Sequence, residues 1–142
     1  MNLFLDDMRV PSDVFIYTRE QIYLSDWYIV RNYDEFVEYI KNNDIPHLIS
    51  FDHDLGKEHY EHQTNINYDD FKEKSGYDCA KWLINYCIDN NLELPQDILI
   101  HSMNIIGGDN IQSLFTTYNK VNNKKHMVYR MFYHDFMNEN LG

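Results

Sequence analysis

The stretch Leu48-Ile49-Ser50-Phe51 runs directly into the acidic cluster Asp52-His53-Asp54. The same arrangement occurs at the N-terminus, where Leu3-Phe4-Leu5 is followed by Asp6-Asp7. A short apolar run of this kind is typical of a buried β-strand. Ligands of open α/β sheets bind outside the carboxyl ends of the strands. The two clusters therefore predict a sheet of buried strands with a functional site at one edge.

The composition describes one folded domain spanning residues 1–142. The 142-residue chain is long enough to bury a core, and it is 44% hydrophobic with three prolines and five glycines. Asp and Glu outnumber Lys and Arg by 23 to 12, for a formal net charge of −11. Long duplex DNA is bound mainly through basic residues, so the charge argues against it as a partner. A small phosphorylated ligand remains compatible, because a divalent metal can reverse the local field.

The chain also lacks the sequence features of a membrane or secreted protein. No segment approaches the roughly 20 apolar residues of a membrane span, and the N-terminus has no signal-peptide layout. Cys79 and Cys87 fall in one predicted helix, about 12 Å apart along its axis, which is too far for a disulfide. These features predict a cytoplasmic protein with no membrane contact.

Five β-rich runs alternate with helical patterns. The predicted strands are Leu3–Asp6, Trp27–Arg31, Leu48–Asp52, Ile98–His101 and Met127–Tyr133. Helical spacing follows the second, third and fourth strands, in the rows Tyr33/Phe36/Val37/Ile40, Cys79/Leu83/Cys87 and Ile111/Leu114/Phe115/Tyr118. Strands that alternate with helices predict a three-layer α/β fold, with a mostly parallel five-stranded sheet and helices on both faces.

The helix starts carry local signals. Ser75 with Asp78 three positions later resembles a capping box. Asp109 is the predicted N-cap of the last helix, with Gly107-Gly108 ahead of it.

Two stretches depart from the alternation. Met8–Asp26 has only a weak helical signal, so we expect a loop with a short helix there. Lys57–Lys74 is a polar insertion directly after the second acidic cluster. A loop of that length beside a site is either a lid or substrate-binding flap, or a plain surface excursion.

Three strand ends carry candidate functional residues. If their strands are parallel neighbours, Asp6, Asp7 and Asp52 converge and form a site for Mg²⁺ or Mn²⁺, with Asp54 as a further candidate ligand. Each aspartate also has a structural alternative, because Asp is common in caps and turns.

The third cluster, His101-Ser102-Met103-Asn104, adds groups that suit a phosphate. A hydroxyl and an imidazole together can form hydrogen bonds to phosphate oxygens. Backbone N–H groups near Asn104 and Gly107-Gly108 could bind an anion or belong to an ordinary turn. His101 is either a proton donor or a buried histidine with satisfied hydrogen bonds. His53 is either a functional imidazole or an exposed loop residue. Arg9 is a candidate phosphate contact or a surface ion pair.

These residues resemble the receiver domains of two-component signalling, in which acidic residues bind Mg²⁺ beside a phosphoacceptor Asp. The sequence is more similar to the cyclic-phosphate processing receiver domains. The matching motifs are Leu5-Asp6-Asp7-Met8-Arg9-Val10-Pro11, Asp52-His53-Asp54-Leu55-Gly56, Ser75-Gly76-Tyr77-Asp78 and His101-Ser102-Met103-Asn104 with Gly107. This resemblance implies a receiver-like (flavodoxin-like) fold and a role on cyclic phosphates of nucleotides or RNA ends.

The sequence differs from signalling receivers after the fifth strand. Receivers place a lysine there to clamp the acyl phosphate, whereas here His134-Asp135 follows, and Lys124 and Lys125 precede the strand. Phosphorelay is therefore disfavoured relative to hydrolysis or binding.

Three hypotheses follow. The first is a metal-dependent phosphoesterase acting on a cyclic phosphate. In it, His53 or His101 donates a proton to the leaving oxygen, Asp52 is a catalytic residue, and Arg9, Ser102 and Asn104 bind the substrate. The second is a non-catalytic module that binds a cyclic nucleotide or a protein partner. The third is an atypical phosphoacceptor receiver modified on Asp52.

Overall fold

Five parallel strands form the centre of the protein in a computed structural model that describes residues 1–55 and 74–133. The strands are β1 (Asn2–Leu5), β2 (Trp27–Val30), β3 (Leu48–Phe51), β4 (Asp97–Ile100) and β5 (Met127–Arg130). Their order in the sheet is β2-β1-β3-β4-β5, and every neighbouring pair is parallel. The predicted parallel sheet is confirmed.

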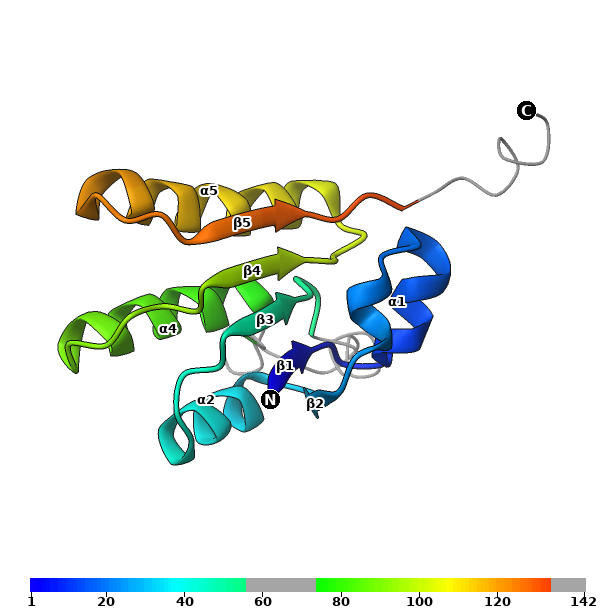
Figure 1. Ribbon diagram of the computed structural model, residues 1–142, viewed down its shortest axis with the longest axis horizontal. Helices are drawn as coiled ribbons and strands as arrows, with labels where there is room; N and C mark the ends of the chain where they lie inside the picture. The colour runs from blue at the N-terminus through cyan, green and yellow to red at the C-terminus, as the bar shows by residue number, and fades with distance from the viewer. Residues whose placement is uncertain (56–73, 134–142) are drawn as a thin grey trace, which may run out of the picture.

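Helices cover both faces of this sheet, as predicted (Figure 1). The helices are α1 (Pro11–Thr18), the 3₁₀ helix η1 (Gln21–Leu24), α2 (Tyr33–Asn42), α4 (Gly76–Asp89) and α5 (Ile105–Asn122). Helices α2, α4 and α5 pack side by side on one face, while α1 and η1 lie on the other. The loop with a short helix expected over Met8–Asp26 corresponds to α1 and η1.

Strand alternation divides the core into two clusters. In β3, Ile49 and Phe51 face the cluster beneath α2, α4 and α5, whereas Leu48 joins the smaller cluster beneath α1 and η1. Ser50, also on β3, is fully buried. One face is thus apolar, and the other includes a buried hydroxyl.

Local signals set most helix boundaries. Pro11 opens α1 at a position where its missing N–H is not needed. Asn32 caps α2 by accepting a hydrogen bond from the backbone N–H of Glu35 at 2.9 Å. The predicted capping box of α4 is present, with Ser75 N–H donating to Asp78 Oδ2 at 2.8 Å.

The start of α5 corrects the prediction. Asn104, not Asp109, is the N-cap, because its side-chain oxygen accepts a hydrogen bond from Gly107 N–H at 2.9 Å. Gly107 and Gly108 lie inside the helix instead of preceding it, and Gly108 N–H donates to Asn104 O at 2.8 Å. Those two N–H groups are therefore used by the helix and do not form the anion site considered from the sequence.

Other expectations have mixed outcomes. β5 ends at Arg130 instead of Tyr133, although Met131 N–H still donates to Ile100 O at 2.8 Å. Cys79 and Cys87 are both buried and free. Apart from Lys74, the predicted polar loop 57–74 lies outside the described residues, as does the pair His134-Asp135. Within residues 1–55 and 74–133, no helix combines the length and apolar character needed to cross a membrane.

Candidate functional site

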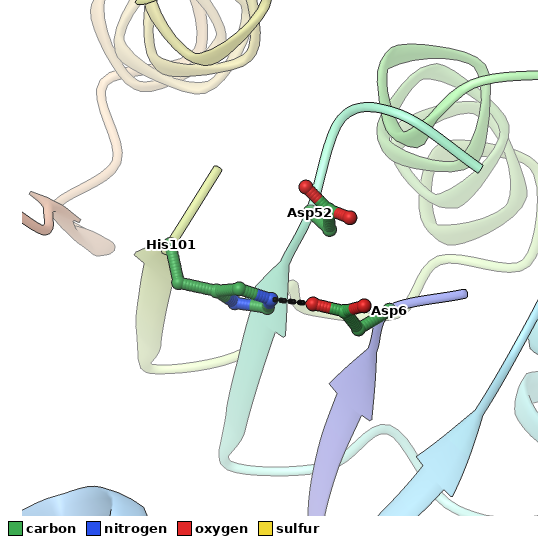
Figure 2. Close-up of side chains that lie close together, drawn as sticks. All are labelled: Asp6, Asp52 and His101. Atoms are coloured by element: carbon green, nitrogen blue, oxygen red, sulfur yellow. Dashed lines mark hydrogen bonds and ion pairs between the residues drawn. The ribbon is translucent and has the colours of Figure 1, made fainter. Parts of the chain in front are cut away.

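Asp6, Asp52 and His101 meet at the carboxyl edge of the sheet, each one residue beyond its strand. The ladder continues past the strand ends, since Asp52 N–H donates to Leu5 O and His101 N–H donates to Phe51 O, both at 2.9 Å. Parallel register therefore puts the three side chains at one level (Figure 2). One ligand atom from each lies within 4.8 Å of the others. The predicted convergence of three strand ends is present.

The Asp6 carboxylate is completely buried and saturated with donors. Its Oδ1 accepts the backbone N–H groups of Met8 at 2.9 Å and Arg9 at 2.8 Å. Its Oδ2 accepts Arg9 Nε at 2.9 Å and faces His101 Nε2 at 3.1 Å. Burial opposes ionisation, but these hydrogen bonds outweigh it and hold the pKa of Asp6 well below its usual range. Asp6 is a fixed negative charge that also orders the loop before α1.

His101 is a buried histidine with both ring nitrogens engaged. Besides the contact with Asp6, its Nδ1 lies 2.6 Å from Ser50 Oγ, which lies 2.8 Å from the Tyr23 hydroxyl. Its ring stacks on Phe4 with centroids 4.6 Å apart. Burial lowers the pKa of His101. A neutral imidazole protonated on Nε2 satisfies the whole chain from Tyr23 to Asp6.

Asp52 carries the unfavourable charge of the cluster. It is 5% exposed, and burial together with the charge of Asp6 raises its pKa to about 7. Burial and Asp6 also raise the pKa of the neighbouring Asp7, which is partly buried. Two carboxylates with raised pKa values beside an ionised one form a site where a cation would be stabilised.

Arg9 is the protein's own cation at this site. In addition to Asp6, its Nη2 lies 3.6 Å from Asp52 Oδ1, and its Nη1 donates to the Tyr133 hydroxyl. The Tyr133 hydroxyl in turn donates to His101 O. The Arg9 side chain is 20% exposed. Of the two predicted alternatives, the ion pair exists, but its partners are the site carboxylates, and the Arg9 side chain is not fully buried.

His53, Asp54 and Asn104 form a second group at the same edge. His53 Nδ1 lies 3.1 Å from Asp54 Oδ1, and Asn104 Nδ2 donates to the same carboxylate at 3.3 Å. The side chain of Asp54 is 68% exposed and that of His53 is 21% exposed. A Cβ on Gly107 would lie 2.3 Å from His53 Cγ, so this glycine makes room for the imidazole. His53 is the histidine of the site that solvent can reach.

The start of α4 packs against the backbone of Asp52 and His53 and fixes its position. Gly76 N–H donates to His53 O at 2.7 Å, and a Cβ at Gly76 would lie 1.7 Å from Asp52 O. Only glycine permits this approach. The motif Ser75-Gly76-Tyr77-Asp78 thus contributes to the site by holding its backbone.

Sequence reasoning missed two residues near the C-terminal end of β5. Arg130 donates to Ser102 O at 3.0 Å and to Asn104 O at 3.4 Å, and so holds the loop that carries both side chains. Ser102 itself is buried, at 2% exposed. Tyr133 joins Arg9 to His101 across the edge. The predicted fifth strand ended at Tyr133, so a strand-end position was the available signal for Tyr133; Arg130 lay inside that predicted strand and carried no such signal. Residues 131–133, which directly follow β5, contain no lysine.

The donor set fits a hard divalent cation. Carboxylate oxygens are the ligands that Mg²⁺ takes from proteins, and Asp52 and Asp7 are the carboxylates with raised pKa values. All four lone-pair positions of Asp6 already have donors, so Asp6 suits a supporting role through its charge. The nitrogen of His101, although close, already faces Asp6.

The fold and the site together define a receiver-like α/β domain. Its strands have the order β2-β1-β3-β4-β5, acidic residues follow β1 and β3, and a serine lies just beyond β4. The chain belongs to the cyclic-phosphate processing receiver domain family, whose sequence profile matches residues 1–117. No curated protein and no solved structure matches the chain. The matched stretch ends within α5, so Arg130 and Tyr133 lie beyond it.

Proposed function

We propose that this receiver-like domain is a Mg²⁺-dependent phosphoesterase that opens the cyclic phosphate of a nucleotide or RNA end. The observation that carries the proposal is the convergence of Asp6, Asp52 and His101 beside the partly exposed Arg9 and His53, with the charge of Asp7 acting on Asp52. Membership in a family described by cyclic-phosphate processing supports the same substrate class. The free, buried cysteines fit a reducing cytoplasm.

In this proposal Asp52 and Asp7 would hold the metal, and the ionised Asp6 would add negative charge that favours a cation beside them. Asp54 remains a candidate ligand at the exposed side. Bound Mg²⁺ (or Mn²⁺) supplies Lewis-acid stabilisation of the negative charge that develops on the phosphoryl oxygens. Arg9, whose side chain is 20% exposed, is proposed to orient the phosphate, and Ser102 and Asn104 to orient it from the neighbouring loop.

The bond changes are those of hydrolysis. A water oxygen bonds to phosphorus, keeping one proton and releasing the other to solvent, while one ring P–O bond breaks and the freed oxygen takes a proton. His53 is the proposed proton donor, because Asp54 contacts its Nδ1 at 3.1 Å and thereby orients the ring. His101 is buried and is proposed as a positioning residue that keeps Asp6 in place. The product is an open-chain phosphomonoester.

One observation favours binding without turnover as the second candidate. Of the two predicted proton donors, His101 is fully buried, so a single imidazole, that of His53, is left for acid catalysis among the described site residues. A binding module would use the same edge and release the cyclic phosphate intact.

The test is incubation of the pure protein with adenosine 3′,5′-cyclic and 2′,3′-cyclic monophosphate and with an RNA ending in a 2′,3′-cyclic phosphate. We expect turnover with Mg²⁺ or Mn²⁺ and none with EDTA. Stoichiometric binding of an intact ligand, measured by calorimetry, would favour the second candidate. Modification of Asp52 by acetyl phosphate would instead favour a phosphoacceptor.

Two matched variants separate the roles. His53→Gln should lower kcat by about 10²–10⁴-fold, the usual contribution of a general acid. His47→Gln, at an exposed histidine away from the site, should leave kcat unchanged. An unchanged kcat in His53→Gln would remove His53 from the mechanism while leaving the metal site intact.

A further inference from the structure

A groove of about 780 Å³ runs along the outer end of β5, beside the start of α5. Its apolar wall includes Met103, Ile105 and Phe132, which are 60%, 72% and 79% exposed. Its volume lies in the range of small-molecule sites. Large apolar side chains left this exposed and grouped together are typical of a binding surface.

The groove is continuous with the proposed phosphate-binding site at the carboxyl edge of the sheet. Ser102 and Tyr133 line it, and both also belong to the site described above. The Tyr133 hydroxyl reaches Arg9 and His101 O on the site side, while Phe132 follows β5 on the groove side. A ligand whose phosphate lies near Arg9 and Ser102 would therefore extend its remaining part into the groove.

The groove suits an uncharged flat group better than a second phosphate. Its cation, Arg130, has a side chain 10% exposed and donates to Ile100 O, Ser102 O and Asn104 O. The Nε of Arg130 makes no hydrogen bond and lies 3.6 Å from Asp109 Oδ1. The guanidinium is thus committed to the protein.

The carboxylates of the groove also disfavour a second phosphate. Glu20 lines it, Asp109 lines it while paired with Arg130, and the whole chain carries a formal net charge of −11. An RNA end would bring further phosphates towards these groups, whereas a single nucleotide would bring only the cyclic phosphate that the site itself holds. Repulsion between like charges therefore favours the monomer.

We propose that this groove binds the base and ribose of a free nucleoside 2′,3′-cyclic phosphate, with the base against Phe132. The inference rests on the proposed function for the position of the phosphate. It assigns a mononucleotide as the substrate class, and the test below distinguishes this from binding of an RNA end.

The experiment is a titration of ¹⁵N-labelled protein in Mg²⁺ with three probes, followed by amide shifts. The probes are adenosine 2′,3′-cyclic monophosphate, a tetranucleotide ending in a 2′,3′-cyclic phosphate, and the base-free glycerol 1,2-cyclic phosphate. Because hydrolysis leaves the base on the product, the groove amides report base binding whether or not turnover occurs.

We expect the adenosine compound to shift the amides of Met103, Ile105 and Phe132 and the glycerol compound not to. Phe132→Ala should weaken adenosine binding about tenfold, which corresponds to about 1.4 kcal/mol of base stacking. Val121→Ala, at a similarly exposed apolar residue of α5, is the matched control and should change nothing. Glu20→Gln should narrow the preference for the mononucleotide over the tetranucleotide.

The outcomes separate this inference from the proposed function. Groove shifts without hydrolysis of any probe would refute the phosphoesterase and keep the base site. Hydrolysis of all three probes with equal kcat/KM, or wild-type affinity in Phe132→Ala, would overturn the base site and keep the phosphoesterase. Tighter binding of the tetranucleotide would reassign the groove to RNA ends, and no groove shifts with any probe would overturn the inference outright.

Discussion

The two faces of the sheet are built from different chemistry. Beneath α2, α4 and α5 lies one continuous apolar cluster, to which β3 contributes Ile49 and Phe51. Beneath α1 and η1, the interior includes the polar chain from Tyr23 through Ser50 and His101 to Asp6. The first face stabilises the fold by apolar burial, and the second fixes a charged site from inside the protein.

This difference shows how the site is kept in place. A buried polar group is tolerated when its hydrogen bonds are satisfied, and here Ser50 and His101 each have a partner on both sides, between the Tyr23 hydroxyl at one end and the ionised Asp6 at the other. Asp52 stands apart from this chain and retains a raised pKa. The unfavourable negative charge of the site is therefore concentrated on Asp52, which is the proposed metal ligand.

The largest expected effect is on the apolar face. Leu83 in α4 is fully buried in the larger cluster, so Leu83→Ala should lower the free energy of unfolding by about 2–5 kcal/mol. Leu92→Ala, at a 42% exposed leucine, is the matched control. Urea denaturation measures both, and equal losses would show that the apolar face is not tightly packed.

Asp52→Asn should change the free energy of unfolding of the metal-free protein in the opposite direction. Removing the buried charge at pH 8 should raise the free energy of unfolding, on the order of 1–3 kcal/mol, because Asp52 is ionised there at a site that disfavours it. If Mg²⁺ binds as proposed, it should stabilise the wild type, and the same variant should lose that stabilisation. Thermal unfolding with and without Mg²⁺ checks both effects. Asp89→Asn, at an exposed position, is the control, and a destabilised Asp52→Asn would contradict the assignment.

Ser50→Ala should break the polar chain at its middle. His101 Nδ1 and the Tyr23 hydroxyl would each lose a buried partner, at a cost of about 1–3 kcal/mol. Ser113→Ala, on the exposed face of α5, should be nearly neutral. If Ser50→Ala and Ser113→Ala had the same free energy of unfolding, the hydrogen bonds from Tyr23 to Asp6 would not stabilise the protein.

The smallest expected effect is the pH dependence of metal-free stability. The folded pKa of Asp52 is raised to about 7, so the folded state binds more protons than the unfolded state below that pH. Its contribution therefore falls as pH rises, by about 1 kcal/mol between pH 6.5 and 8. Below about pH 6.5 the lowered pKa of His101 opposes this trend, because there the unfolded histidine binds the extra proton.

The measurement is denaturant unfolding in EDTA at pH 6.5 and pH 8. Asp52→Asn serves as its own control here, and its stability should change less than that of the wild type across the same interval. A wild-type stability that rises towards pH 8 would place the raised pKa elsewhere.

Much of the site could be predicted because its residues directly follow strands. Asp6, Asp52 and His101 each come one position after an apolar run, and parallel register brings such positions together. The N-cap of α5 was misjudged because Asp109 and Asn104 are both good caps by residue type. The hydrogen bond from Gly107 N–H selects Asn104.

By itself, the sequence determined the alternation of strands and helices, the capping box of α4 and the acidic edge, since each is encoded in neighbouring residues. Only the tertiary structure decided that His101 is buried and neutral, that Arg9 pairs with the site carboxylates, and that Arg130 and Tyr133 complete the edge. Arg9 and Tyr133 are 124 positions apart. Such contacts depend on strand order and register, which bring distant strand ends together and which no local pattern of residue types records.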